Sequence, residues 1–306
     1  MQGAIIKTYF TKAKGIKPED IVNVTITPCV AKKFEIDRAE FSSAGKYLKK
    51  KNMPDNDYII TTVELAKWCK EEGINLKSLK EEPFDELLGQ ASGAGVIFGN
   101  TGGVMEAALR TAYSYLTGEE PSSLVLNFKP VRGLADTKEA EVEFAGKKLR
   151  VVAVYGLANT RKLLDKIKKG AKYDFVEIMT CPGGCIGGGG QPKHIGEEEE
   201  VREARIKALY ARDRKLAVRA SHLNPEIKAL YDNFLSKPGS KLAKQLLHTS
   251  YIDRSGDLSV PQVKEDSKMK TVKYRCKICG EVFEVPEGQE AACPLCKMKG
   301  DKLERI

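Results

Sequence analysis

Two segments of the chain combine a strand-like apolar run with a cysteine just behind it. Residues 20–26 are rich in β-branched side chains and lead to Cys29, and residues 173–179 lead to Cys181. Each pattern predicts a strand followed by a loop that carries the cysteine. Because binding sites in open α/β sheets form beyond the carboxyl ends of the strands, we expect these two loops to converge on one site.

The rest of the pattern predicts a mixed α/β fold with a separate C-terminal region after a linker. A third strand is expected at residues 149–155, and a glycine-rich stretch covers residues 92–103. Residues 253–271 are polar and have the composition of a linker. Helical spacing of apolar positions predicts helices at residues 63–72, 84–88, 104–115, 160–169 and 197–219, with two short helices within residues 224–247.

The length and composition fit one large α/β unit plus a small one. The 306 residues exceed a typical single domain, and 42% hydrophobic with 30% charged residues is ordinary for a soluble globular protein. No apolar run approaches the roughly 18 to 20 residues of a membrane-spanning helix, and the N-terminus lacks the regions of a signal peptide. We therefore expect a cytoplasmic protein with no membrane span.

The net charge of +9 does not predict a nucleic-acid partner. Lysine and arginine are interleaved with 42 acidic residues, and no basic stripe with interspersed aromatic side chains is present. An acidic electron-carrier protein is a better match for diffuse positive charge, although such charge also occurs on an ordinary solvated surface.

Four cysteines near the C-terminus have the spacing of a metal site. They form two C-x2-C pairs: Cys276, Cys279, Cys293 and Cys296. Four thiolates give a closed tetrahedral site, and about thirty residues bury too small a core to fold without such help. The pattern resembles rubredoxin-like domains, which implies one iron, but a structural zinc ribbon has the same ligands. We expect a metal domain at residues 272–306.

A second cysteine motif is embedded in glycine. Cys181 and Cys185 flank two glycines, and the run continues to Gly190. Glycines remove side chains where a large group approaches the backbone, and their N–H groups can face an anionic cluster. A redox disulfide between the two cysteines and a plain flexible loop are the alternatives. A phosphate-binding loop is not favoured, because no Gly-Lys-Ser/Thr follows.

Counting thiolates predicts an incomplete cluster site. Cys29, Cys181 and Cys185 are three candidate ligands, whereas a 4Fe-4S cubane usually takes four. Cys69 is the remaining cysteine, but it lies in a predicted amphipathic helix beside Trp68, where a free cysteine is most often a small buried hydrophobe.

Two motifs resemble active-site signatures of FeFe (iron-only) hydrogenases. Residues 175–192 resemble the third signature, F-x-E-x-M-x-C-x-G-G-C-x-x-G-G-G-Q-P, and residues 27–35 resemble the second, M-P-C-x-x-K-x-x-E, with Thr27 in place of methionine. Residues 92–110 and 222–251 are also similar to parts of the family. The resemblance implies two α/β lobes around an H-cluster, in which a 4Fe-4S cubane is joined to a two-iron unit, and reversible reduction of protons to dihydrogen.

The resemblance also implies roles for individual residues. Cys29, Cys181 and Cys185 would ligate the cubane, Cys185 would bridge to the two-iron unit, and Lys32 would hydrogen-bond a cyanide ligand. Four residues, each of which is otherwise ordinary core, would line an apolar cavity around the two-iron unit: Phe98, Gly99, Val104 and Met179.

The family's first signature, T-S-C-C-P-x-W, does not occur in this sequence. In the family it lies upstream and supplies the fourth cubane ligand and a proton-passing cysteine, so we expect an upstream segment or a second chain to provide it. The electron partner would be ferredoxin or an NAD(P)H-linked subunit. A non-catalytic iron–sulfur binding or redox-sensing relative is the alternative.

The same comparison predicts four regions. Residues 1–196 would form a catalytic domain without its first signature, and residues 197–252 a helical region similar to the family's small subunit. The linker at 253–271 and the metal domain at 272–306 would complete the chain.

Overall fold

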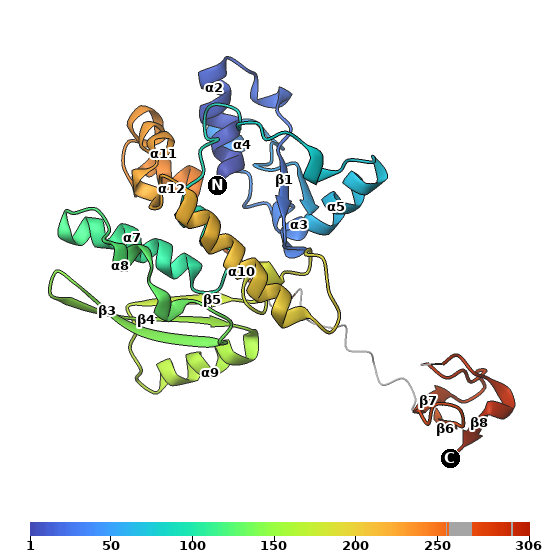
Figure 1. Ribbon diagram of the computed structural model, residues 1–306. Helices are drawn as coiled ribbons and strands as arrows, with labels where there is room; N and C mark the ends of the chain where they lie inside the picture. Colours follow the sequence, from blue (N-terminus) through green and yellow to red (C-terminus); the bar gives the residue numbers. More distant parts are fainter. Residues whose placement is uncertain (255, 257–270, 295) are drawn as a thin grey trace. The chain divides into compact units, whose positions relative to one another are not determined.

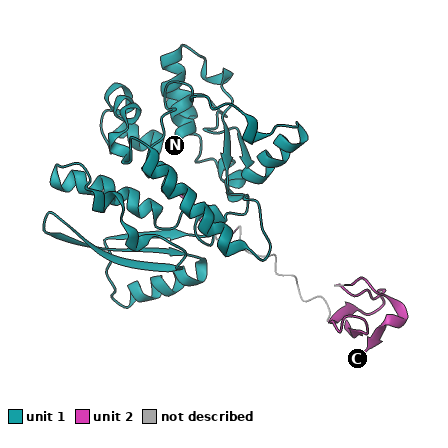
Figure 2. Cartoon of the chain, viewed as in Figure 1, with its two compact units in different colours: residues 1–250 teal, residues 251–306 magenta. Residues whose placement is uncertain are grey.

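The computed structural model describes residues 1–254, 256, 271–294 and 296–306. The chain divides into two compact units, residues 1–250 and residues 251–306 (Figure 2). Most of the linker expected at 253–271 lies outside the described residues. Among the described residues, no helix has both the length and the apolar composition needed to cross a membrane.

The first predicted strand is part of a two-stranded parallel sheet. β1 (Val24–Thr27) is shorter than the expected strand, and it pairs with β2 (Tyr58–Thr61), which the pattern did not predict. The helices of this region are α1 (Gln2–Ile5) and α2 (Thr11–Lys14), joined by a π-helical turn at Ile6–Phe10, then α3 (Ala31–Ile36), α4 (Ser43–Leu48) and α5 (Thr62–Glu71) (Figure 1).

The predicted helix at 63–72 is confirmed as α5, and a capping box fixes its start. The Thr61 hydroxyl accepts from the Glu64 N–H at 3.3 Å, and the Glu64 carboxylate accepts from the Thr61 N–H at 2.8 Å. Each side chain thus satisfies a backbone group that a helix terminus leaves open.

A three-stranded sheet contains the other two predicted strands. β4 (Lys147–Tyr155) pairs in parallel with β5 (Phe175–Met179), and α9 (Leu157–Lys168) forms the crossover between them. β3 (Thr137–Phe144) was not predicted; it runs antiparallel to β4, to which a tight turn at residues 145–146 connects it, and both turn residues have positive φ.

Both faces of β4 are covered by helices. Val152 and Val154 pack on Leu163 of α9, while Val151 packs on Met105 of α7 (Gly103–Thr117). Because both faces are covered, this central strand of a mixed sheet reads as a continuous apolar run.

The remaining helices confirm most of the pattern and correct part of it. Residues 84–88 are not helical: Leu87 and Leu88 have φ of 72° and 65°, which a right-handed helix does not allow. The helix expected at 197–219 ends at Lys215. The other helices of the unit are α6 (Gly93–Ile97), which begins inside the glycine-rich stretch, α8 (Ser123–Leu126), α10 (Glu198–Lys215), α11 (Pro225–Leu230) and α12 (Lys241–Leu247), with a π-helical turn at Tyr231–Leu235.

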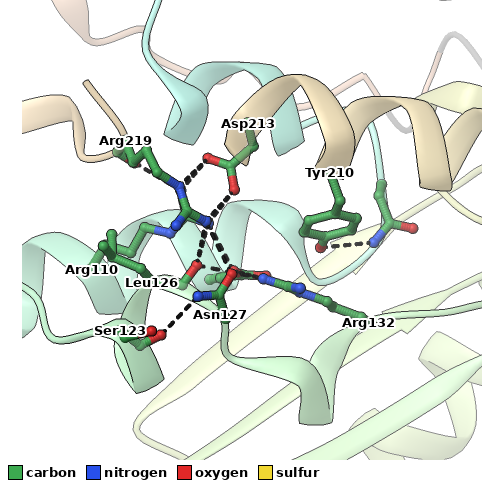
Figure 3. A network of polar contacts seen from close by, with 10 residues as sticks. Arg110, Ser123, Leu126, Asn127, Arg132, Tyr210, Asp213 and Arg219 are labelled. Atoms are coloured by element: carbon green, nitrogen blue, oxygen red, sulfur yellow. Dashed lines mark hydrogen bonds and ion pairs between the residues drawn. The ribbon is translucent and has the colours of Figure 1, made fainter. Parts of the chain in front are cut away.

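A buried ion network joins α7 to α10 (Figure 3). Arg110 of α7 donates to both carboxylate oxygens of Asp213 at 2.8 and 2.9 Å and to Glu106 at 2.8 Å, and all three side chains are completely buried. Arg219 also donates to Asp213, and Arg132 to Glu106. Because each charge has partners of opposite sign, the network tolerates burial that an isolated charge would not.

Replacing Asp213 by asparagine keeps the shape of the side chain but removes the negative charge that Arg110 and Arg219 share. We expect the free energy of unfolding of residues 1–250 to fall by about 3 kcal/mol or more. Denaturant unfolding followed by circular dichroism measures this change. The control Glu203→Gln lies on the same helix, and its exposed pair with Lys207 should contribute about 0.5 kcal/mol or less. Equal midpoints for the two variants would contradict the importance of the network.

Candidate metal centres

The two predicted cysteine loops converge. Cys29 follows β1, and Cys181 and Cys185 follow β5, with Cys185 opening a 3-10 helix at Cys185–Gly187. Burial raises the pKa of the Cys185 thiol; the neighbouring Cys29 and Cys181 raise it further, and Lys32 lowers it. These side chains therefore lie within electrostatic reach of the Cys185 sulfur.

Lys32 is held on α3 by an ion pair with Glu35, one helical turn further on. Its side chain is about half exposed, and its positive charge favours the Cys185 thiolate. Cys29, Cys181 and Cys185 are free thiols of intermediate burial. Three thiols and one cation thus lie within electrostatic reach of one another around Cys185, although among the described residues only the C-terminal cysteines have their sulfurs within 4.8 Å of one another.

The glycines of the cysteine loop allow close contact with other backbone segments of the protein. A Cβ on Gly188 would lie 2.3 Å from the Pro28 carbonyl oxygen. Gly184 has a φ of 98°, and its Cβ would lie 2.6 Å from the Thr101 nitrogen. Both distances are shorter than any real Cβ contact, so the loop requires glycine in order to touch its protein neighbours.

The N–H groups of this loop are also largely used within the protein. Gly190 donates to the Pro28 carbonyl at 2.9 Å, Ile186 to the Gly99 carbonyl at 3.0 Å, and Thr101 donates back to the Gly183 carbonyl at 2.9 Å. Three more loop N–H groups, those of Gly184, Gly187 and Gly188, donate to carbonyls within the loop itself. These hydrogen bonds order the loop and join it to neighbouring segments, so it is not the plain flexible loop considered as an alternative.

The four residues expected to line an apolar cavity lie at the ends of the elements around this loop. Gly99 accepts the Ile186 N–H, Val104 is in the first turn of α7, and Met179 is the last residue of β5; all three are partly buried. Phe98 is 46% exposed. The described residues therefore leave its side chain open to solvent, and enclosure of an apolar cavity would need further polypeptide.

Glu177 has a structural role that the motif did not reveal. It lies buried on β5 and accepts the N–H groups of Gly102 at 2.6 Å and Met105 at 2.7 Å, which fixes the first turn of α7. Burial raises the pKa of this carboxyl group, and the two hydrogen bonds and Lys138 oppose the rise. The sequence signal for this role was the position of an acidic residue in the middle of the apolar run at 175–179, where a buried carboxylate needs hydrogen-bond partners.

Lys138 lies buried next to the same turn. Its ammonium donates to the carbonyls of Thr101 at 2.7 Å and Gly133 at 2.9 Å, and burial lowers its pKa to about 8. It therefore ties β3 to the segment on which the cysteine loop packs.

Cys69 does not occupy the buried position expected for it. α5 contains no fully buried residue, Cys69 is only half-buried, and Trp68 is 53% exposed. Cys69 lines a shallow hollow with Ala66 and Ile74. It is a surface cysteine of α5.

The four C-terminal cysteines form a compact cluster. The Sγ atoms of Cys276 and Cys296 are 3.4 Å apart, those of Cys279 and Cys293 3.5 Å, and those of Cys279 and Cys296 3.5 Å. All four sulfurs lie within 4.8 Å of one another. A tetrahedron of sulfurs about 2.3 Å from a central ion has edges of about 3.8 Å, so the donor set fits one zinc or iron.

Two equivalent turns position these sulfurs. The Gly280 N–H donates to the Cys276 carbonyl at 2.8 Å, the Lys297 N–H donates to the Cys293 carbonyl at 2.9 Å, and both donors have positive φ. The backbone N–H of Cys279 is the main cause that lowers the pKa of Cys276, to about 6, which favours the thiolate. The sheet of this unit has the order β7 (Val282–Pro286), β6 (Thr271–Cys276) and β8 (Leu303–Arg305), all antiparallel.

Comparison with known proteins identifies the family. Residues 1–189 match the model of the iron only hydrogenase large subunit, C-terminal domain, and residues 199–254 match that of the iron hydrogenase small subunit. These matches agree with an α/β protein that has cysteines at the ends of two strands. The chain belongs to the iron-only (FeFe) hydrogenase family.

Relatives within the family differ in what their names describe. The chain is 46% identical over 254 residues to the NADP-reducing hydrogenase subunit HndD of Solidesulfovibrio fructosivorans, covering 83% of this chain and 42% of that protein. It is 39% identical to iron hydrogenase 1 of Clostridium pasteurianum, again covering 42% of that protein. It is also 33% identical to the cytosolic Fe-S cluster assembly factor narfl of Xenopus tropicalis, over 82% of this chain and 52% of that protein.

Solved structures confirm the predicted fold class. A variant of apo FeFe-hydrogenase HydA1 from Chlamydomonas reinhardtii matches with a TM-score of 0.64 and 41% identity, over 82% of this chain and 67% of that chain. The chain spans less than half the length of HndD and of iron hydrogenase 1, at 42% of each.

The requirement for glycine in the cysteine loop can be tested at adjacent positions. Gly188→Ala places a methyl group against the Pro28 carbonyl, so we expect a loss of about 1 to 3 kcal/mol of stability. Gly189→Ala meets only the exposed, movable Val30 side chain and should change stability by about 0.5 kcal/mol or less. Thermal unfolding of the two variants measures the difference, and equal effects would refute the close-approach explanation.

Proposed function

We propose that this chain is the active-site portion of a hydrogenase that catalyses the reversible reduction of protons to dihydrogen. The observation that carries the proposal is the backbone contact between the Cys29 loop and the loop of Cys181 and Cys185, in which the Gly190 N–H donates to the Pro28 carbonyl at 2.9 Å; Lys32 lies within electrostatic reach of Cys185. Family membership supports it. Because the chain matches 42% of the length of HndD, the activity of the whole enzyme is part of the proposal.

The cysteines would hold an H-cluster. Cys29, Cys181 and Cys185 would ligate its cubane, and the Cys185 sulfur would also join the two-iron unit. When bound, that unit supplies an open iron for two-electron chemistry. Three thiolates fit three of the four ligand positions of a cubane, and the family's first signature would supply the fourth from an upstream segment or a second chain.

The other site residues would control the surroundings of the cofactor. The Lys32 ammonium, oriented by Glu35, would donate a hydrogen bond to an anionic cyanide ligand, and a cation is a strong donor to an anion in a dry pocket. Phe98, Gly99, Val104 and Met179 would exclude water once the exposed ring of Phe98 is covered. Thr27, in place of methionine, would make one wall more polar.

A non-catalytic iron–sulfur protein is the second candidate. One observation favours it: relatives named as cytosolic iron–sulfur assembly factors are 31 to 33% identical over more than four fifths of the chain. The same three cysteines would then bind a cluster without hydrogen turnover.

We further propose that electrons come from ferredoxin or an NAD(P)H-linked subunit, in the cytoplasm, with no nucleic-acid partner. The name of the relative HndD supports a pyridine-nucleotide link. The C-terminal site would hold one iron, with zinc as the alternative. Exposure of Cys279 favours iron, because it would give electrons a short path between the metal and a carrier.

Cysteine variants test the ligand set. After anaerobic reconstitution with iron and sulfide, Cys181→Ala should bind less than half of the iron that the unaltered chain binds at residues 1–250, because a cubane with two protein ligands is not retained. Cys69→Ala should bind the same amount as the unaltered chain. Iron and acid-labile sulfide are measured in a Cys279→Ser background, which removes the C-terminal site. Iron loss in Cys69→Ala would show that the ligand set is wrong.

Hydrogen evolution tests the reaction. The reconstituted chain is mixed with a synthetic two-iron cofactor and a recombinant polypeptide that contains T-S-C-C-P-x-W from an iron-only hydrogenase, and dihydrogen is measured by gas chromatography with reduced methyl viologen. We expect evolution with the polypeptide and little without it, and Lys32→Met should reduce the rate at least about ten-fold. If the complete mixture contains the full cluster but forms no dihydrogen, the hydrogenase proposal is rejected and the non-catalytic function is favoured.

Metal analysis tests the C-terminal site. The chain should contain one metal ion bound by residues 271–306, and Cys293→Ser should remove it. Iron would give sulfur-to-iron charge-transfer absorption in the visible range, whereas zinc is colourless. Removal of the ion by a chelator should unfold β6, β7 and β8 and leave residues 1–250 folded, because a unit this small depends on its metal. Unchanged folding of the small unit without metal would contradict this dependence.

A further inference from the structure

Two oppositely charged side chains bind the two ends of one buried peptide group. The Lys138 ammonium donates to the Thr101 carbonyl at 2.7 Å, and the Gly102 N–H of the same peptide bond donates to the Glu177 carboxylate at 2.6 Å. A peptide dipole is negative at its oxygen and positive at its N–H, so both contacts are favourable. Lys138 is 6% exposed, Glu177 5% and Thr101 0%. We call this arrangement the Lys138–Glu177 clamp.

The residue whose carbonyl is held in this way also contacts the cysteine loop. The Thr101 N–H donates to the Gly183 carbonyl at 2.9 Å, and a Cβ on Gly184 would lie 2.6 Å from the Thr101 nitrogen. Gly183 lies two residues from Cys181 and two from Cys185. A shift of Thr101 would therefore move the backbone that carries both cysteines.

The charge of the clamp also reaches the cysteine site. Burial is the main cause that raises the pKa of the Cys185 thiol, and the Glu177 carboxylate adds to the rise, so its negative charge acts at that sulfur. Both oxygens of Glu177 accept a backbone N–H, as an ionised carboxylate does. The Lys138 ammonium carries the opposite charge next to the same peptide group. It therefore offsets a negative charge that would otherwise act alone on a bound cluster.

We propose that Lys138 is a positioning residue of the iron–sulfur site, which fixes the peptide between Thr101 and Gly102 together with Glu177 and sets the reduction potential of the bound cluster. A one-electron reduction makes the cluster more negative, so a nearby positive charge favours the reduced state and a negative charge the oxidised state. Lys138 thus raises the potential and Glu177 lowers it. The inference rests on the proposed function, since it needs a cluster held by the three cysteines, with or without hydrogen turnover.

Variants that remove one charge test the potential. Each is made in the Cys279→Ser background, reconstituted with iron and sulfide, and titrated with dithionite at pH 7, while electron paramagnetic resonance follows the reduced cluster. Burial lowers the pKa of Lys138 to about 8, so it is protonated at this pH. Lys138→Met should lower the potential and Glu177→Gln should raise it, each by about three- to ten-fold in the equilibrium constant, or about 30 to 60 mV.

Two further variants are the controls for this titration. Lys148→Met removes an exposed charge from the neighbouring strand β4 and should leave the potential unchanged. Lys138→Arg keeps the buried charge and should keep the potential close to that of the unaltered chain.

Hydrogen exchange tests the positioning without a cluster. In the unloaded chain, the exchange of amide hydrogens within residues 99–103, followed by mass spectrometry, reports how firmly this segment is held. Lys138→Met should speed the exchange at least about ten-fold relative to Lys148→Met. Residues 151–154, which are completely buried in β4, should exchange as in the unaltered chain, which excludes general unfolding.

The outcomes separate this inference from the proposed function. Opposite shifts from Lys138→Met and Glu177→Gln support it, because damage to the fold would not change sign with the charge removed. Shifts of the same sign, or potentials equal to that of Lys148→Met, would overturn it, and so would unchanged exchange in Lys138→Met. If Lys138→Met does not fold, the shift of Glu177→Gln decides. An unaltered chain that binds no cluster would reject the proposed function, and hydrogen exchange would then decide the positioning.

Discussion

Close packing of the glycine loop at 181–190 against two other backbone segments is the constraint on which the site depends. The loop is hydrogen-bonded to Pro28 on one side and to residues 99–101 on the other, and it has no space for side chains at Gly184 and Gly188. These contacts bring the ends of β1 and β5 together. These backbone contacts fix the position of Pro28, next to Cys29, relative to the loop that carries Cys181 and Cys185.

Buried polar side chains hold the surrounding elements in place at the first turn and at the middle of α7. Glu177 fixes its first turn to β5, and Arg110 joins it to Asp213 of α10. α7 lies in the part that matches the large-subunit model, and α10 in the part that matches the small-subunit model. In this single chain, an ion network with a completely buried centre at Glu106, Arg110 and Asp213 therefore connects two regions that have separate family models. Each anchor costs desolvation, which its paired charges or hydrogen bonds offset.

The sequence was most informative where a pattern is local. Apolar runs predicted β1, β4 and β5, the spacing of cysteines predicted the C-terminal cluster, and the two motifs predicted the family. Long-range contacts could not be predicted: the reason for glycine at 184 and 188 is the position of backbone atoms far away in the chain. β3 alternates Ala140, Val142 and Phe144 with charged residues, a strand signal that was available and missed. The helix expected at 84–88 failed because helical spacing over five residues says little about backbone dihedrals.

The central claim is that residues 1–250 provide three thiolates to one iron–sulfur cluster and leave one iron without a protein sulfur. Such a cubane loses that iron on mild oxidation and becomes a three-iron cluster with its own electron paramagnetic resonance signal, whereas a cubane with four thiolates resists the change. The measurement is this signal in the reconstituted Cys279→Ser chain after oxidation with ferricyanide. We predict a three-iron signal from the chain alone. A four-iron cluster that survives oxidation unchanged in the chain alone would contradict the account.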